Sequence, residues 1–195
     1  EGRRQLFRYR KKLWADLVRV KNRIKDKMLF AGIEIPPKMD NSYWSKAFLK
    51  WLATVEFKSL ATRQTLDLLL EQYEFIYRHF LKTSIQVRKL QRSNALKNDA
   101  VLFRSIPGIG PLTTVQLLTE IEDIDRFKNF KKFNSYIGLR PRTHSSGERD
   151  YKGRMTYRSH GTLRSSLIEC AWSSIQQDPA MTQAYEEFRS TMTPK

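Results

Sequence analysis

Two long stretches without Pro or Gly constrain the fold of this 195-residue chain more than any other feature. In the first, residues 3–30, Leu13, Leu17, Val20 and Ile24 recur at steps of three and four residues. This spacing places the four side chains on one face of an α-helix. The stretch is therefore predicted to form a long amphipathic helix.

The second stretch, residues 59–98, is predicted to be one long helix with a coiled-coil-like seam. Its apolar residues alternate at steps of three and four, with Thr83 as the polar exception: Leu66, Leu69, Tyr73, Ile76, Phe80, Val87 and Leu90. Heptad spacing of this kind is typical of coiled coils. The two long helices could pack as an antiparallel hairpin within one chain or dimerise with a second chain, and the sequence leaves both open.

The charge of the chain favours a polyanionic partner. Thirty-six Lys and Arg against twenty Asp and Glu give a formal net charge of +16, which makes nucleic acid the first candidate. The first helix is itself strongly basic, with Arg8, Arg10, Lys11, Lys12, Arg19, Lys21, Arg23, Lys25 and Lys27. A solvated helix face is the alternative, but the excess of one sign favours contact with phosphates.

Cysteine content and hydropathy exclude several classes of protein. Cys170 is the single cysteine, which excludes an internal disulfide and a zinc site built on paired cysteines, and predicts a reducing, cytoplasmic setting. No apolar run approaches the roughly 18 to 20 residues that span a bilayer, so no membrane partner is expected. The chain begins with Glu1 and not Met, which suggests a fragment.

A glycine-containing turn is predicted between two apolar helical segments in residues 101–124. Gly108 and Gly110 separate the segments, and Pro111 suits the first turn of the second. This pattern is typical of a helix-hairpin-helix, whose glycines and unpaired helix-start N–H groups can hold a nucleic-acid backbone. The alternative is a turn between two core helices. A further helix is predicted to end at Gly138 with a left-handed cap.

Residues 142–164 surround the two serines Ser145 and Ser146 with positive charge and contain few large apolar residues, which predicts a loop or hairpin. The cations predicted to bind nucleic acid here are Arg142, Arg149, Lys152, Arg154, Arg158 and Arg164. A serine hydroxyl can attack a phosphodiester when fixed cations meet the developing charge. The same arrangement also binds phosphate without chemistry, so the residues leave both readings open.

Several blocks in order carry a resemblance to a known family: residues 106–111, 117–121, 125–127, 136–141, 146–147, and Leu163-Arg164 with Leu167. Over about residues 100–175 the chain resembles the C-terminal domain of insertion-sequence transposases related to the pilin-gene invertase. Upstream, residues 8–13 and 21–24 are similar to that family's basic linker. Full-length members pair a nuclease-like domain bearing four acidic residues with this serine-bearing domain and are guided by a structured bridge RNA.

The resemblance implies roles for individual residues. Ser146 would be the nucleophile that becomes joined to a cut DNA end, with Ser145 as the alternative if the register slips by one. Arg142 and Arg164 would steady the phosphate or the strand, and the turn with Gly108 and Gly110 would grip nucleic acid. The chain departs from the family pattern at residues 157–161, where Gly161 comes late, so the helix start there is expected to differ.

The resemblance also implies what lies outside this chain. A divalent metal, Mg²⁺, is expected in the nuclease-like domain, which is absent, and the acidic residues present lack the strand setting of a metal cluster. The partners would be donor and target DNA, a guide RNA and further copies of the chain. This fragment alone is therefore not expected to recombine DNA.

The combined prediction is an all-α chain with at most a small hairpin at the serine loop. Residues 1–98 would form a basic helical linker with coiled-coil character, and residues 99–195 a C-terminal transposase domain with a helix-hairpin-helix. The predicted function is serine-dependent cleavage and rejoining of DNA, in a cytoplasmic, nucleoid-associated protein. The alternative is a non-catalytic helix-hairpin-helix module that only binds nucleic acid.

Overall fold

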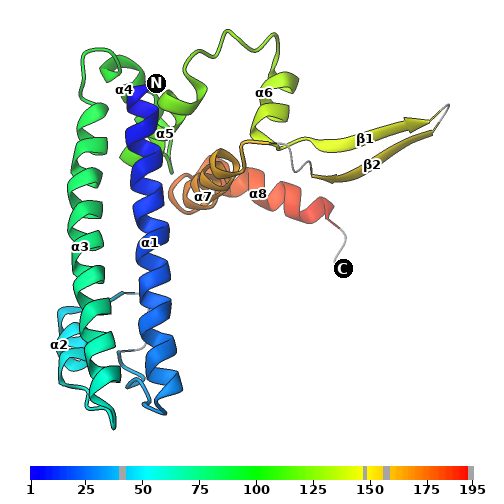
Figure 1. Ribbon diagram of the computed structural model, residues 1–195. Helices are drawn as coiled ribbons and strands as arrows, with labels where there is room; N and C mark the ends of the chain where they lie inside the picture. Colours follow the sequence, from blue (N-terminus) through cyan, green and yellow to red (C-terminus); the bar gives the residue numbers. More distant parts are fainter. Residues whose placement is uncertain (40–42, 147–148, 156–158, 193–195) are drawn as a thin grey trace. The chain divides into compact units, whose positions relative to one another are not determined.

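The computed structural model describes residues 1–39, 43–146, 149–155 and 159–192, with the backbone alone for residues 142–146, 149–152 and 154. Within these residues the elements follow in the order α1 (Gly2–Phe30), α2 (Lys46–Thr54), α3 (Leu60–Leu90), α4 (Lys97–Ser105), α5 (Pro111–Ile121), α6 (Phe130–Ile137), β1 (Pro141–Ser146), β2 (Arg149–Met155), α7 (Gly161–Gln177) and α8 (Pro179–Thr191) (Figure 1). The predicted all-α class is confirmed, and the two strands form the small hairpin at the serine loop.

Contacts between residues divide the chain into two compact units. The N-terminal helical unit comprises Arg8–Ile85, and the C-terminal unit comprises Glu1–Phe7 together with Gln86–Lys195. Helices α1 and α3 each contribute residues to both units. The division into residues 1–98 and 99–195 stays a prediction, because contacts describe packing and do not test which segment folds alone.

The core of the N-terminal helical unit lies between the two predicted seams. Leu17, Val20 and Ile24 of α1 are at most 1% exposed and pack in one cluster with Leu66 and Tyr73 of α3. The same cluster includes two residues of α2, Phe48 and Leu52. Within this unit α1 and α3 therefore pair as an antiparallel hairpin in one chain (Figure 1). A coiled coil in the strict sense and association between chains stay predictions.

An arginine holds α2 against the start of α3. The Arg63 Nη1 donates to the carbonyl oxygens of Leu52 at 3.0 Å and Val55 at 2.9 Å, which lie at the C-terminal end of α2. Its Nε also donates to Asp67 at 3.2 Å, and this hydrogen bond lowers the pKa of the Asp67 carboxyl. One guanidinium thus satisfies carbonyls that a helix end leaves without partners.

The second long helix ends earlier than the sequence predicted. A helix through residue 98 was expected, but α3 ends at Leu90 and α4 begins only at Lys97. The Ser93 hydroxyl donates to the carbonyl oxygen of Leu90 at 2.7 Å, and the backbone turns there. Ser and Asn side chains compete with helical hydrogen bonds in this way, and Ser93 is followed by Asn94.

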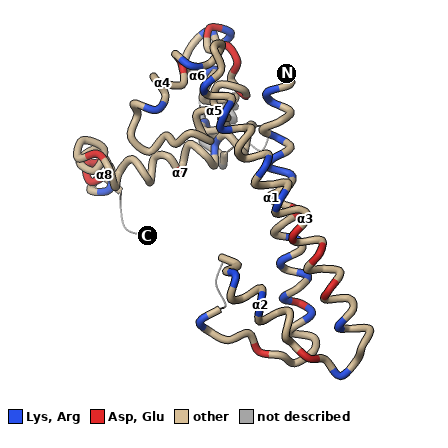
Figure 2. The backbone as a smooth tube through the Cα atoms, turned by 90° about the vertical axis from the view of Figure 1, so that its left-hand side faces the viewer, with Lys and Arg blue, Asp and Glu red and all other residues tan. Residues whose placement is uncertain are grey.

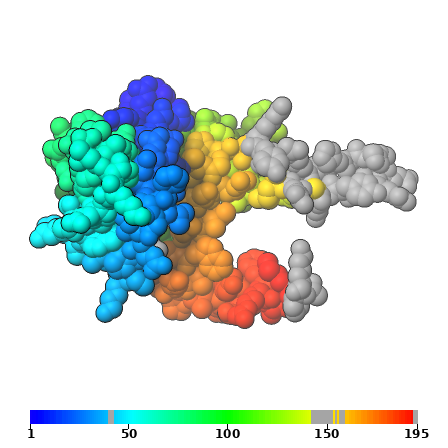
Figure 3. Space-filling view, turned by 60° about the horizontal axis from the view of Figure 1, so that its bottom comes forward, coloured from blue at the N-terminus to red at the C-terminus, as the bar shows by residue number. Residues whose placement is uncertain are grey.

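The C-terminal unit has two small apolar clusters. Leu117 and Ile121 of α5 pack with Ile137 of α6 and Leu163 of α7 in the larger one. The smaller one joins Val115 to three residues of the long helices and α5: Phe7, Val87 and Leu112. Helix α8 packs on α7, where the rings of Trp172 and Tyr185 lie 5.6 Å apart, and both helices form the orange and red surface in Figure 3.

Among the described residues, none of the helices combines the length and the apolar character that crossing a bilayer requires.

Replacing Leu66 by Ala should destabilise the N-terminal helical unit, because Leu66 is completely buried. Leu-to-Ala changes in a core lower the free energy of unfolding by about 2–5 kcal/mol. Leu68 on the same helix is 66% exposed, so Leu68→Ala is the matched control and should cost less than about 0.5 kcal/mol. Urea unfolding followed by circular dichroism measures both, and equal losses would contradict the predicted packing.

The N-terminal helical unit should lose stability at high pH through Tyr73. Burial, and then the nearby Tyr77 and Glu74, raise the pKa of the Tyr73 hydroxyl from 10.0 to about 12. Because the folded pKa is the higher one, this stabilisation is present below pH 10 and disappears as the pH rises towards 12. Tyr73→Phe should therefore weaken the alkaline loss in urea unfolding, whereas Tyr43→Phe, at an 82% exposed position, should leave it unchanged.

Candidate nucleic-acid interface

The predicted nucleophile lies at the turn of the β-hairpin formed by β1 and β2. Ser146 is the last residue of β1, and the antiparallel register places Arg149 directly opposite it. Ser145 is paired in register with Asp150 instead. The structure thus brings Ser146 and one predicted cation together as cross-strand neighbours, whose Cα atoms lie about 4.5–5.5 Å apart in such pairs.

The other predicted cations follow the same two strands. Arg142 belongs to β1, and Lys152 and Arg154 belong to β2, with Lys152 opposite Thr143. With Arg149, the two strands carry four cations against a single carboxylate, Asp150. The side chains of these residues, and Arg158 altogether, lie outside the described part of the chain. Their contacts with nucleic acid stay predictions.

The two ends of the hairpin meet at a tightly packed base. Gly138, which ends α6 with φ of 88°, leaves no space for a side chain, because a Cβ atom would lie 2.3 Å from the side chain of Ser159. The Arg164 Nη1 donates to the carbonyl oxygen of Gly138 at 3.2 Å. The backbone N–H of His160 donates to the carbonyl oxygen of Tyr136 at 2.9 Å. We call these five residues the hairpin base: Tyr136, Gly138, Ser159, His160 and Arg164.

Arg164, which the resemblance assigns to the phosphate or the strand, has a described contact within the protein. Its guanidinium lies against the backbone of Gly138 in the hairpin base. The side chain of Arg164 is half-buried in the first turn of α7. A contact with nucleic acid stays a prediction for this residue, and its described contact is structural.

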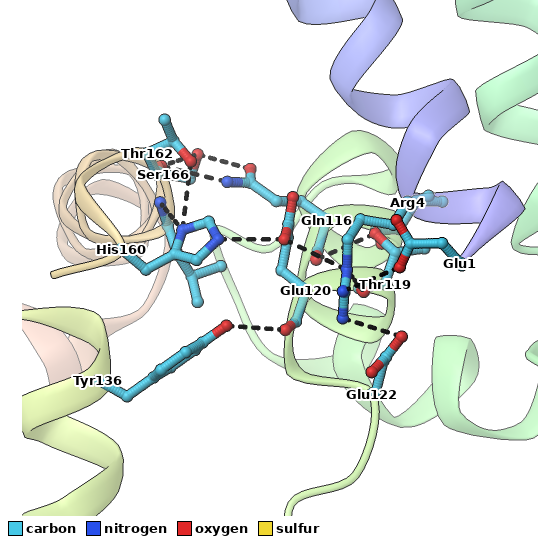
Figure 4. A network of polar contacts seen from close by, with 12 residues as sticks. Glu1, Arg4, Gln116, Thr119, Glu120, Glu122, Tyr136, His160, Thr162 and Ser166 are labelled. Carbon is cyan, nitrogen blue, oxygen red and sulfur yellow. Dashed lines mark hydrogen bonds and ion pairs between the residues drawn. The ribbon is translucent and has the colours of Figure 1, made fainter.

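A buried carboxylate contacts His160 of the hairpin base (Figure 4). Glu120 of α5 is 2% exposed, and its Oε2 lies 3.1 Å from the Nε2 of His160 and 3.6 Å from the Nε of Arg4. His160 also caps α7, because its Nδ1 accepts from the N–H of Leu163 at 3.3 Å. An accepting Nδ1 carries no proton, so Nε2 carries it and donates to the Glu120 carboxylate. The Tyr136 hydroxyl donates to the carbonyl oxygen of Glu120 at 3.1 Å.

Arg4 holds the end of α5 from the other side. Its Nε donates to the carbonyl oxygen of Thr119 at 3.0 Å, and its Nη2 lies 2.8 Å from the Oε1 of Glu122. Glu122 is the residue after α5 and has φ of 60°, which residues other than Gly rarely adopt. Arg4 therefore contacts the residue whose backbone is strained at the end of α5. The first helix and α5 are thus joined within the C-terminal unit.

A second set of polar contacts joins α5 to α7. Gln116 is 3% exposed, and its Nε2 donates to the carbonyl oxygen of Thr162 at 3.1 Å. Its Oε1 accepts from the Ser166 hydroxyl at 2.7 Å. Both ends of this buried carboxamide therefore have partners, as burial of a polar group requires. Together with Glu120 it fixes the start of α7, to which the hairpin returns (Figure 4).

Sequence reasoning assigned no role to Arg4, Glu120 or His160. One signal was present, because Glu120 is the one acidic residue in the apolar helix PLTTVQLLTEI. A charged residue at a core-facing helix position predicts a buried partner. The sequence does not identify that partner, since His160 is 40 residues away and Arg4 more than 100.

The two predicted glycines of the α4–α5 turn have different surroundings. Gly108 has φ of 84°, and a Cβ atom there would lie 2.3 Å from the carbonyl oxygen of Cys170 on α7. Gly108 therefore packs against α7. Gly110 is the N-cap of α5 with φ of −84°, and the space beside it is open. Pro111 is the first residue of α5, as predicted. The helix-hairpin-helix role in binding nucleic acid stays a prediction.

The basic face of α1 is partly occupied by contacts within the N-terminal helical unit. The Arg10 guanidinium lies 4.6 Å from the ring centre of Phe80, and its Nε donates to Ser84 at 2.8 Å. The Lys21 ammonium lies 5.4 Å from the ring centre of Trp44, and burial, then Lys25, lower its pKa. Other cations of α1 have exposed side chains, among them Lys12, Arg19 and Arg23. Figure 2 shows in blue where Lys and Arg follow one another along this helix.

The described residues do not fit a divalent metal. Within residues 1–39, 43–141 and 159–192, no three His, Cys, Asp or Glu side chains come together in a way that would hold an ion. Glu120, the most buried carboxylate there, already has His160 and Arg4 as partners. A divalent metal in a nuclease-like domain stays a prediction.

Comparison with known proteins shows what the C-terminal part of the chain is similar to. Residues 100–186, from α4 into α8, match the family model described as "Transposase IS116/IS110/IS902 family". This range includes the α4–α5 turn, the hairpin and its base. The C-terminal part of the chain is thus a domain similar to the transposase domain of that family.

The chain is also similar to individual transposases and to a gene-inverting protein. The chain is 28% identical to the transposase for insertion sequence element IS1328 of Yersinia enterocolitica over 176 residues, which cover 88% of the chain and 49% of the relative. It is 36% identical to the transposase for IS1111A of Coxiella burnetii over 73 residues, covering 37% and 20%. It is 39% identical to the pilin gene-inverting protein of Moraxella bovis over 74 residues, covering 37% and 23%. The chain thus spans at most about half the length of these relatives.

Replacing Gly108 by Ala should destabilise the C-terminal unit. The new methyl group would meet the backbone of Cys170 and Ser174, and the positive φ disfavours any side chain. Overpacking of this kind costs about 1–3 kcal/mol. Gly110→Ala is the matched control, because its surroundings are open and its φ is negative, and it should cost less than about 1 kcal/mol. Equal effects in thermal unfolding would contradict the described packing of the turn.

Proposed function

We propose that this chain is the linker and C-terminal part of a DNA transposase that cuts and rejoins DNA strands through Ser146. The observation that carries the proposal is the position of Ser146 at the turn of a cation-rich hairpin, opposite Arg149. The similarity of residues 100–186 to a transposase domain supports it. The register also favours Ser146 over Ser145, because the neighbour of Ser145 is a carboxylate, Asp150, which would repel a phosphate.

The proposed chemistry has two steps that conserve the phosphodiester bond. In the first, the Ser146 hydroxyl oxygen attacks a backbone phosphorus, and the bond from that phosphorus to one deoxyribose oxygen breaks. The serine proton passes to solvent, and the departing oxygen takes up a proton. In the second, a hydroxyl group of the strand to be joined attacks the same phosphorus, the bond to serine breaks, and the serine is protonated again. No external energy is required.

The chain's own residues would stabilise the charge of these steps. Negative charge on the phosphoryl oxygens is stabilised by positioned cations, and Arg guanidinium groups suit this role because they bind two oxygens at once. Arg149 lies opposite Ser146 and would contact the reacting phosphate, whereas Arg142 and Arg154 lie towards the hairpin base and would contact neighbouring phosphates of the strand. The hairpin base would hold these strands in place through Gly138 and Arg164.

The remaining parts of the proposal concern the complete protein. The relatives are longer than this chain, and we propose that the acidic nuclease-like domain with its Mg²⁺ belongs to a further part of the transposase. Donor and target DNA, a structured guide RNA and further copies of the protein would be its partners, and the cytoplasmic nucleoid its place of action. This chain by itself would bind nucleic acid without recombining it.

A covalent adduct tests the serine mechanism. The complete transposase, incubated with guide RNA and end-labelled DNA, should yield a protein–DNA adduct that survives denaturing electrophoresis. Ser146→Ala should abolish the adduct because it removes the attacking oxygen. Ser145→Ala, the matched control next to it, should retain it.

Two outcomes of this experiment would contradict the proposal in different ways. An adduct that persists in Ser146→Ala and disappears in Ser145→Ala would show that the nucleophile is Ser145 and not Ser146. The absence of any adduct in the unaltered protein, together with retained DNA binding, would favour the alternative of a non-catalytic binding module.

A further inference from the structure

A pocket of about 420 Å³ lies in the C-terminal unit where α3 gives way to α4. Gln91, Arg92 and Asn94 of the connection form one side, and one face of α4, with Lys97 and Arg104, forms the other. This pocket is formed by the break in the second long helix. It includes no residue of the β-hairpin or its base.

The pocket has the charge of an anion site. Three of its lining residues are cations, Arg92, Lys97 and Arg104, and all three have exposed side chains. None of its lining residues is acidic. Asp99 belongs to the first turn of α4 but does not line the pocket. Cations that converge on one recess without a carboxylate raise the local concentration of anions.

The start of α4 adds to the positive electrostatic potential of the pocket. Leu96 occupies the N-cap position and provides no side-chain hydrogen bond to the helix. The N–H of Lys97 already donates to the carbonyl oxygen of Ser93 at 3.0 Å, and the first turn as a whole carries the partial positive charge of a helix start. Lys97, at this helix start, lines the pocket.

The wall of the pocket also contains a polar group without a partner. Gln91 is 9% exposed, and its Oε1 is buried and accepts no hydrogen bond. A ligand in the pocket does not reach this oxygen, because the atom has almost no accessible surface. The NH₂ group of the same side chain, which lines the pocket, is a hydrogen-bond donor for an anion.

We propose that this pocket binds a phosphate of a nucleic-acid backbone, as a second contact site apart from the serine hairpin. The class of ligand rests on the proposed function, whereas the site rests on the pocket itself. Arg92, Lys97 and Arg104 contact the phosphate oxygens, and Gln91 contacts the same group from the wall. The site reads no base sequence, because phosphate contacts position a nucleic acid without specifying it.

The test compares two triple variants of the 195-residue chain for binding of a labelled DNA duplex across a range of salt concentrations. The pocket variant carries Arg92→Gln, Lys97→Gln and Arg104→Gln. The control variant carries Lys50→Gln, Lys58→Gln and Lys82→Gln, which remove the same charge from exposed positions of the N-terminal helical unit. Circular dichroism of each variant verifies that its helices are retained.

The pocket variant should bind DNA at least about tenfold more weakly, and the slope of log K against log salt should become shallower by about 0.9 for each lost phosphate contact. The control variant should keep the slope and lose less than about threefold in affinity. Gln91→Glu, which places a carboxylate in the wall, should also weaken binding. Equal losses of DNA affinity in the two triple variants would contradict the proposed phosphate site.

Two further outcomes separate the site from the proposed function. If the unaltered chain does not bind DNA at all, the proposed nucleic-acid role fails, and the ligand assigned to this pocket fails with it. In the other outcome, DNA binding is unchanged in the pocket variant, and inorganic phosphate raises the melting temperature of the unaltered chain but not that of the pocket variant. The ligand is then a small phosphate compound, and the assignment to a nucleic-acid backbone is wrong.

Discussion

The buried contact between Glu120 and His160 determines how the C-terminal unit holds its β-hairpin. Glu120 belongs to α5, and His160 is the residue at which the chain returns from the hairpin and enters α7. A carboxylate that is 2% exposed requires hydrogen-bonding partners, and without them its charge would be strongly unfavourable. His160 and Arg4 meet this requirement, so one side chain joins the start of the chain, α5 and the hairpin base.

This arrangement separates the packing of the domain from its proposed chemistry. The apolar side chains of α5, α6 and α7 form the core, and the polar contacts of Glu120 and Gln116 fix where α7 begins. The strands themselves have four cations and few large apolar side chains, so their position depends on the base from which they extend. A reactive serine in such a hairpin would be positioned through the helices that hold the hairpin base.

Local features of the structure were predictable from the sequence, because they depend on neighbouring residues. The seams with Leu17 and Leu66, the left-handed cap at Gly138 and the helix start at Pro111 follow from spacing and from the conformational preferences of Gly and Pro. The end of α3 was predicted wrongly, because apolar spacing continues past Leu90 while Ser93 turns the backbone. Contacts between distant residues were not predictable: nothing local to Gly108 indicates that it packs on Cys170, and nothing local to Glu120 indicates His160 or Arg4.

The proposed bond to DNA forms in one short segment of the hairpin, and its position can be measured directly. Trypsin cleaves after Arg142 and Arg149, and so releases residues 143–149, which contain Ser145 and Ser146. The protein–DNA complex formed by the complete transposase would be digested with nuclease and trypsin, and its peptides sequenced by mass spectrometry. If Ser146 is the nucleophile, this peptide should contain a phosphate or nucleotide remnant on Ser146. A remnant on a residue outside 143–149, with this peptide recovered unmodified, would contradict this assignment.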